Sequence, residues 1–300
     1  MNLNDFQNIE FGLALFIDDE EHYIRIPVDD TVKNSLVEMR TEFYKQFDNG
    51  EEEPENFSPS EKYAGTERLK ANPKEDYLSS IRELYDINNI PISNLDLSEA
   101  AESIGYYFAV FHNNNGNREL AIKRPSQFKG LLKKKNKLVR WADDTLKVIP
   151  DDVFKLDQDF DFIVVSDDRI NILHPAGFIL ISDMHEQILQ SAVESATQLT
   201  QRVTCVNFTA LTSFISHSKR AAKLVASIKS RDDLERTSME KLKNLCNVLR
   251  IDIQEENGQI LPSENHILDF LYVLDRRQYD IDITDLQPEI YVAASRKQIR

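Results

Sequence analysis

The sequence predicts an α+β protein with a mixed N-terminal α/β part, a central, mostly antiparallel sheet and a helical C-terminal region. Three observations predict this class. Residues 106–181 contain short β-branched or aromatic runs separated by turn residues. Residues 184–249 repeat apolar side chains at helical spacing, and residues 1–100 contain both patterns. We therefore expect an acidic α/β region over 1–100, a β-rich region with a basic segment over 101–181, and a mainly helical region over 182–300.

In the first region, residues 9–17 and 22–26 are predicted strands, joined as a hairpin by the acidic residues 18–21. Residues 31–47 are a predicted helix, because apolar side chains recur at every third or fourth position. Residues 48–60 contain four glutamates and two prolines, which indicates a loop, and a short helix is predicted over 74–85.

The middle region is predicted to form strands over residues 106–111, 119–123, 145–149, 160–166, 169–173 and 177–181. Asparagine-rich residues 112–117 and the pair Asp167 and Asp168 supply turns between them. In the last region a helix capped by Ser182 is predicted to run to residue 203. Two more are expected, one over 211–228 and one opening at Ser230.

Charge is distributed unevenly along the 300 residues, whose formal net charge is -15. Residues 1–100 carry 23 acidic against 9 basic side chains, so the acidity belongs to this first third. Only Cys205 and Cys246 are present, which is no disulfide framework, and no signal peptide is recognised. Apolar runs are far shorter than the roughly 18–20 residues that span a bilayer. We therefore expect a cytoplasmic protein.

The strongest local signal is a run from Lys123 to Arg140 with eight basic residues and no acidic one. Ser126 is a plausible cap for a helix over 127–142, on which four basic side chains would form one stripe. Such a stripe can contact several phosphates of a duplex, although a solvated helix face is the usual explanation of a charge run. The predicted DNA-contacting residues here are Lys123, Arg124, Lys129, Lys133, Lys134, Lys137 and Arg140. A second, smaller basic group on a predicted helix comprises Lys219, Arg220 and Lys223. By itself this group indicates a solvated helix face, and it favours DNA binding only if folding or dimerisation places it beside the first group.

Familiar enzyme motifs are missing from the sequence. No two of the eight glycines lie within ten residues of each other, so neither a Walker A loop nor a dinucleotide-binding loop is present. The six histidines show no metal-binding spacing, and no lysine follows an acidic residue by two positions, as many metal-dependent nucleases require. Asp157, Asp159 and Asp161 alternate along an extended segment, which indicates a solvated strand edge or, less readily, a metal cradle. No catalytic residue, metal or cofactor is therefore predicted, and a nuclease with an unfamiliar carboxylate site stays the alternative.

Residues 154–173 and 274–299, together with YYFAVF at 106–111 and LAIKR at 120–124, resemble the KwaB-like family of the Kiwa anti-phage defence system. The resemblance extends loosely over residues 104–299. It implies a cytoplasmic, homodimeric effector that acts with a membrane-embedded partner of the KwaA type and binds DNA to oppose phage replication. It identifies no catalytic residue.

The acidic first third suggests where such a partner binds. Cytoplasmic loops of membrane proteins are rich in Lys and Arg, so an acidic surface is attracted to them and repelled by DNA and anionic lipid. A purely solubilising role for the acidity is equally consistent with the sequence. The residues expected to face the partner are Asp18, Asp19, Glu20, Glu21, Glu51, Glu52, Glu53 and Glu55.

Overall fold

The computed structural model describes residues 5–18, 20–50, 53–63, 65, 67–86, 103–125, 131–132, 139–142, 145–148, 153–281 and 289–293. The chain forms two compact units. Unit 1 comprises Met1–Asn56, Ala64–Glu75 and Ser79–Ser182. Unit 2 comprises Phe57–Tyr63, Asp76–Leu78 and Asp183–Arg300. The α+β class predicted from the sequence is confirmed, because unit 1 is built on a large sheet and unit 2 is mostly helical.

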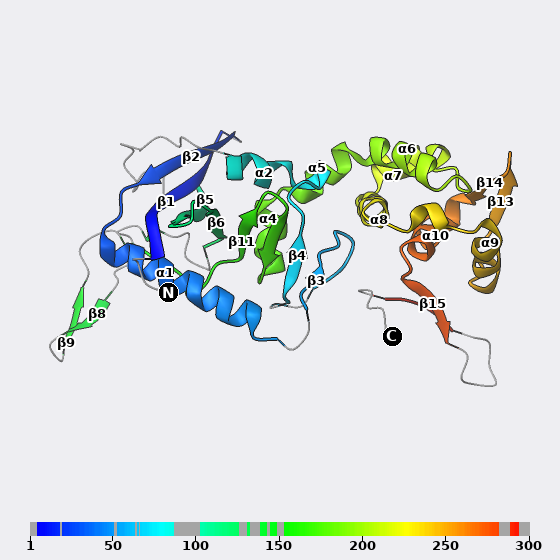
Figure 1. Cartoon of the computed structure of the whole chain (residues 1–300). Helices are drawn as coiled ribbons and strands as arrows, with labels where there is room; N and C mark the ends of the chain where they lie inside the picture. Colours follow the sequence, from blue (N-terminus) through cyan, green and yellow to red (C-terminus); the bar gives the residue numbers. More distant parts are fainter. Residues whose placement is uncertain are drawn as a thin grey trace. The chain divides into compact units, whose positions relative to one another are not determined.

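Unit 1 is organised around an eight-stranded sheet with the order β2-β1-β5-β6-β11-β12-β4-β3 (Figure 1). Its strands are β1 (Phe6–Ile17), β2 (Glu20–Ile26), β3 (Glu55–Asn56), β4 (Leu69–Ala71), β5 (Ile104–Asn113), β6 (Arg118–Lys123), β11 (Phe162–Ser166) and β12 (Arg169–Ile172). Only the β3–β4 pair is parallel; the other described pairs of this sheet are antiparallel. The predicted β1–β2 hairpin is confirmed, with Asp18 in the left-handed conformation (φ 52°) at its turn.

The predicted N-terminal helix is also confirmed, as α1 (Asp30–Asp48). The Asp29 carboxylate accepts a hydrogen bond from the Val32 N–H at 2.9 Å and so caps its first turn. Leu36, Met39 and Phe43 are buried in one apolar cluster with side chains of β1 and β5, so α1 covers one face of the sheet (Figure 1). Each such burial stabilises the fold by about 1.5–3 kcal/mol.

The opposite face of the sheet is covered by α4 (Pro175–Ile181). Neighbouring residues of a strand point to opposite faces. Ile163 of β11 belongs to the α1 cluster, whereas the Phe162 ring contacts the Phe178 ring of α4 edge-on, with centroids 5.1 Å apart. The predicted strand over 177–181 is therefore wrong. A short apolar run does not distinguish a strand from a buried helix, and Pro175 in the first turn favours the helix.

The helix predicted over residues 127–142 is also wrong where the chain is described. Leu131–Leu132 (β7) pairs with Val153–Phe154 (β10), and Val139–Ala142 (β8) forms a hairpin with Thr145–Val148 (β9). Gly130, and Lys135, which would point to the apolar side of such a helix, disfavour one continuous helix. The cap at Ser126 lies outside the described residues.

The remaining helix among the described residues of unit 1 is α2 (Ser79–Asp86), and η2 (Asp76–Leu78) of unit 2 directly precedes it. Together they replace the single short helix predicted over 74–85.

In its described residues, unit 2 is mainly helical and contains the β13–β14 and β15–β16 hairpins. Its elements are α5 (Met184–Gln190), α6 (Ala192–Arg202), η3 (Thr209–Leu211), α7 (Thr212–His217), α8 (Lys219–Lys229), η4 (Leu234–Arg236), α9 (Met239–Val248), β13 (Ile253–Glu256), β14 (Gln259–Pro262), η5 (Glu264–His266), α10 (Ile267–Leu274), β15 (Gln278–Ile281) and β16 (Glu289–Val292).

The long helices predicted for this unit are divided at serines. Ser191 separates α5 from α6, and Ser218 separates α7 from α8. The third helix, α9, begins at Met239 rather than at Ser230, because Ser238 provides the cap by accepting a hydrogen bond from the Lys241 N–H. Serine competes for backbone hydrogen bonds, which favours such boundaries.

Segment 57–63 is held in unit 2 by a buried polar network. Asp275, fully buried, accepts hydrogen bonds from the Ser227 hydroxyl at 2.8 Å and the Ser60 hydroxyl at 3.1 Å. The Ser58 hydroxyl lies 2.8 Å from that of Ser227, and Arg277 donates to the Ser60 carbonyl at 2.7 Å. Each buried polar group thus has a partner, so the network stabilises the unit.

Candidate functional site

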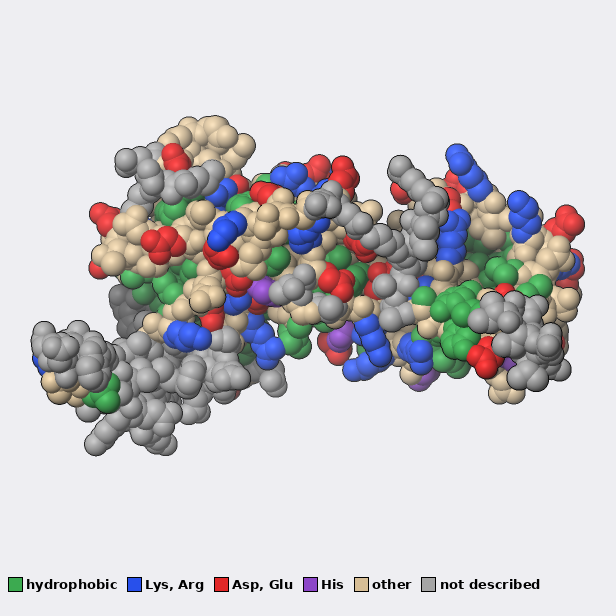
Figure 2. Space-filling model, turned by 90° about the horizontal axis from the view of Figure 1, so that it is seen from below, with side chains coloured by type: hydrophobic (Ala, Val, Ile, Leu, Met, Phe, Trp, Pro, Cys, Tyr) green, Lys and Arg blue, Asp and Glu red, His purple; other side chains and the backbone are tan. Residues whose placement is uncertain are grey.

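Five of the predicted DNA-contacting residues have described side chains: Lys123, Arg124, Lys219, Arg220 and Lys223. Arg140 is described only as part of the β8 backbone, where it pairs in register with Lys147 of β9. The other predicted contacts of this segment, Lys129, Lys133, Lys134 and Lys137, lie outside the described residues. Figure 2 shows that Lys and Arg side chains form several groups on the face drawn.

Lys123 does not lie on an exposed basic surface. It is buried at the end of β6, and its Nζ lies 3.0 Å from Asp159 Oδ1 and 3.0 Å from Asp161 Oδ1. Two carboxylates thus neutralise the ammonium group that was expected to contact a phosphate. We correct its assignment accordingly: Lys123 is part of a buried charge cluster.

Three short segments of unit 1 build this cluster. The aspartates lie just before β11, and His174, whose Nε2 is 3.1 Å from Asp159 Oδ1, lies between β12 and α4. Asp161 Oδ2 also accepts a hydrogen bond from the Arg124 N–H at 2.8 Å. A Cβ at Gly177 of α4 would lie 2.2 Å from Asp161 Oδ2, so only glycine permits this close approach of the helix.

The charges of the cluster shift one another's pKa values. Burial disfavours the ionised form of Asp159, but His174 and Lys123 outweigh it and hold its pKa well below the usual value. The more deeply buried Asp161 has a raised pKa, since desolvation dominates there. The adjacent Asp159 raises the pKa of His174, and the two carboxylates raise that of Lys123 against the effect of burial.

The triplet of alternating aspartates is therefore not a solvated strand edge. Asp161 is buried, and Asp157 accepts a hydrogen bond from the Tyr107 hydroxyl at 3.2 Å. Among the described residues, no group of three or more His, Cys, Asp or Glu side chains is placed to hold a metal ion. The Lys123 ammonium lies between Asp159 and Asp161, in the position that a metal ion bound by these two carboxylates would occupy. Sequence reasoning missed the pairing because Lys123 and Asp159 are 36 residues apart.

The second basic group is at the start of α8 in unit 2. Lys219 and Arg220 are exposed, and Lys223 is half-buried one turn further along. The Arg220 guanidinium lies over the Tyr272 ring, 5.0 Å from its centroid, and its Nε donates to the Tyr272 hydroxyl. Lys223 Nζ lies 3.3 Å from His185 Nε2 of α5, a histidine that the sequence did not mark as functional. The structure thus places a fourth basic side chain beside Lys223.

Of the acidic residues expected to face a partner, Asp18, Glu20, Glu53 and Glu55 are exposed, while Asp19, Glu51 and Glu52 lie outside the described residues. Glu21 is half-buried and accepts a hydrogen bond from the Tyr106 hydroxyl.

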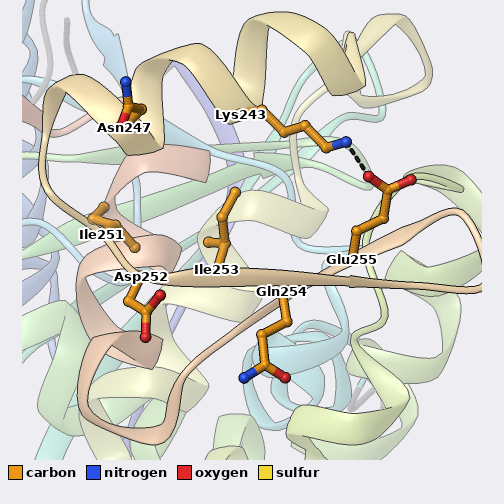
Figure 3. A pocket seen from close by; sticks show the side chains of 7 residues that line it. All are labelled: Lys243, Asn247, Ile251, Asp252, Ile253, Gln254 and Glu255. Carbon is orange, nitrogen blue, oxygen red and sulfur yellow. Dashed lines mark hydrogen bonds and ion pairs between the residues drawn. The ribbon is translucent and has the colours of Figure 1, made fainter.

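Unit 2 also contains a polar pocket of about 400 Å³ between α9 and β13 (Figure 3). The Lys243 side chain extends from α9 and pairs with Glu255. The Ile253 side chain points toward α9, whereas those of Asp252 and Gln254 point away from it. Lys243 and Glu255, the oppositely charged pair that lines this pocket, neutralise each other. We therefore assign no function to the pocket.

Comparisons with known proteins provide the family. The sequence model of the family described as "Kiwa protein KwaB-like" matches residues 104–284, more than half of the chain. This range contains β5, β6 and β11, the buried charge cluster and both basic groups. Searches of curated proteins and of solved structures gave no match. No helix among the described residues is long and apolar enough to cross a membrane. By this match over residues 104–284, the chain belongs to the KwaB-like family of Kiwa proteins.

Proposed function

We propose that this chain, a component of Kiwa anti-phage defence by its family, is a non-catalytic, DNA-binding effector that opposes phage DNA replication. The observation that carries the proposal is the concentration of positive charge in two short groups of a chain whose net charge is -15. No acidic residue interrupts the sequence from 124 to 140, and none of the described carboxylates forms an ion pair with Lys219, Arg220 or Lys223. Such charge binds the phosphate backbone by releasing counterions.

The proposed DNA contacts are the predicted ones without the buried Lys123. They are Arg124, Lys129, Lys133, Lys134, Lys137, Arg140, Lys219, Arg220 and Lys223. The two groups belong to different units, so each is to be tested separately.

The test is binding of a fluorescent duplex by variants of the full chain. Replacing Lys129, Lys133, Lys137 and Arg140 together by glutamate should abolish binding at physiological salt, because each reversal replaces a phosphate attraction by a repulsion. The matched control reverses the exposed Lys241 of α9, outside both groups, and should bind like the wild type. A quadruple variant that folds normally and binds with unchanged affinity would refute the proposed interface.

The same samples test the nuclease alternative. A metal-dependent nuclease needs a metal site, and the described residues contain no group of three or more His, Cys, Asp or Glu side chains that could hold a metal ion. The proposal predicts that phage DNA incubated with the purified protein stays intact, both in the presence of Mg²⁺ and in the presence of a chelator. Cleavage that requires Mg²⁺ and disappears in Asp159→Asn would contradict a non-catalytic role.

The wider proposal is that the chain acts in the cytoplasm as a homodimer, next to a membrane partner of the KwaA type. Family membership supports it, and so does the exposure of Asp18, Glu20, Glu53 and Glu55, which suits the Lys- and Arg-rich loops of membrane proteins. Replacing these four residues by serine or asparagine should weaken co-purification with the partner. A complex of unchanged strength and salt sensitivity would mean that the partner docks elsewhere.

A further inference from the structure

The basic group of α8 is unbalanced, unlike the opposite end of the same helix. At the C-terminal end, Lys229 pairs with Asp76, and just beyond it Arg231 pairs with Asp233 at 2.6 Å. At the N-terminal end, Lys219 and Lys223 form no ion pair with a described carboxylate. The position of Lys219 also opposes the helix macrodipole, whose positive end lies in the first turn of α8. Folding stability alone therefore does not explain the group.

His185 brings a further basic side chain to the same place. Its Nε2 accepts a hydrogen bond from the Lys223 ammonium at 3.3 Å, and its Nδ1 is buried without a hydrogen-bond partner among the described residues. An imidazole that accepts from a lysine is neutral. Once the imidazole is protonated, His185 Nε2 and Lys223 Nζ are both hydrogen-bond donors. The arrangement then needs an acceptor that binds both of them.

The charges around His185 come from few residues. Lys223 and Lys219 of α8 act on it, and from its own helix only the exposed Glu186 opposes them. On η2, which also packs against α5, Asp76 is already paired with Lys229. On α6, Glu194 accepts a hydrogen bond from Gln198. Burial and the two lysines consequently lower the pKa of His185, and burial and Lys219 lower that of Lys223.

A phosphate oxygen is the ligand that this arrangement accommodates. It accepts hydrogen bonds from an ammonium, a guanidinium and an imidazolium, and its negative charge offsets the repulsion among them. The Arg220 guanidinium, next to Lys219 in the sequence, is held over the Tyr272 ring and is therefore preoriented. Binding of a phosphate thereby favours uptake of a proton by His185.

We infer that Lys219, Lys223 and His185 form a proton-dependent site for a phosphodiester of DNA, in which His185 takes up a proton when the phosphate binds. The inference rests on the proposed DNA binding and adds to it a histidine contact and a pH dependence. DNA binding should accordingly tighten as the pH falls through the range in which His185 titrates.

The experiment measures duplex affinity between pH 7.5 and 5.5 at constant ionic strength, for the wild type, His185→Gln and the control Lys241→Gln. One linked proton changes affinity by at most about tenfold per pH unit, and we expect the wild type to gain at least about threefold more than His185→Gln over this range. Lys241→Gln should keep the wild-type pH dependence. Parallel pH profiles of the wild type and His185→Gln, with both binding DNA, would overturn the inference and leave the proposed function intact. Absence of DNA binding at every pH would overturn both.

A second measurement follows the His185 imidazole by NMR in the full chain. The duplex should raise its pKa above the value in the free protein. Inorganic phosphate at matched ionic strength should raise it much less, because a duplex brings several phosphates to the group at once. An equal shift with inorganic phosphate would assign the site to a free phosphate and overturn DNA as its ligand. No shift with the duplex would overturn the site itself.

Discussion

Lys123 makes the sharpest prediction about unit 1, because the sequence assigns it to a DNA surface and the structure to a buried charge cluster. Lys123→Met keeps the length of the side chain and removes its charge, which leaves Asp159 and Asp161 without their common cation. The side chains of Lys123, Asp159 and Asp161 are 10%, 13% and 7% exposed, so both ion pairs of Lys123 are largely buried. Removing one partner of a buried ion pair costs about 3–5 kcal/mol.

A loss of about 3–5 kcal/mol in a domain of about 150–250 residues lowers the melting temperature by about 6–20 °C, at about 2–4 °C per kcal/mol. Urea unfolding followed by circular dichroism gives the free energy, and hydrogen exchange of β6 assigns the loss to unit 1. The matched control is Lys155→Met. The Lys155 side chain is 43% exposed, and its Nζ lies 3.2 Å from Oδ1 of Asp157, which is 10% exposed. Because water reaches the Lys155 ammonium, we expect its removal to cost about 1 kcal/mol or less.

Neutralising the whole cluster provides a further check. Adding Asp159→Asn and Asp161→Asn to Lys123→Met removes the uncompensated charges, so this triple variant should be more stable than Lys123→Met alone. The reasoning is refuted if Lys123→Met loses no more stability than Lys155→Met. It is equally refuted if the triple variant is the least stable of the set.

Two further predictions concern the same cluster. The pKa of His174 is raised in the folded protein, so its contribution to stability is complete below the unfolded-state pKa of about 6.5 and is lost as the pH rises through the folded value. Urea unfolding should therefore show the wild type losing its advantage over His174→Gln above about pH 6.5, and parallel pH profiles would contradict this. Gly177→Ala should destabilise the protein by about 1–3 kcal/mol although alanine favours helices, because its Cβ meets Asp161. Gly65→Ala, which has nothing within 4 Å of its Cβ, should have little effect, and equal effects of the two substitutions would count against the close packing.

Local patterns sufficed to predict much of the fold. The β1–β2 hairpin and α1 each repeat apolar residues with the period of one structure over nearly the whole element, and tertiary packing uses the same face. The prediction of a strand over 177–181 failed because five apolar residues fit a buried strand and a buried helix equally well. The outcome was decided by Pro175 and by the contact of Gly177 with Asp161.

The candidate sites divide in the same way. Lys219, Arg220 and Lys223 are close in sequence on one helix, so their clustering could be predicted. His185 joins them from another helix 38 positions away, and Lys123 meets its aspartates only because β6 pairs with β11. No spacing rule on a single sequence reports such contacts. In the sequence, the one indication of such a contact is that Lys123 ends an apolar strand and that Asp157, Asp159 and Asp161 follow it at close spacing.

The central claim, that this member of the KwaB-like family binds the DNA backbone through concentrated positive charge, is tested most directly by the salt dependence of its affinity for a duplex. The logarithm of the binding constant should fall linearly with the logarithm of the salt concentration, with a slope of about -0.9 for each phosphate contacted. Replacing Lys219, Arg220 and Lys223 by glutamine should make that slope shallower by about 2–3. An affinity that is unchanged between low and physiological salt, or a slope that the triple variant does not alter, would contradict the account.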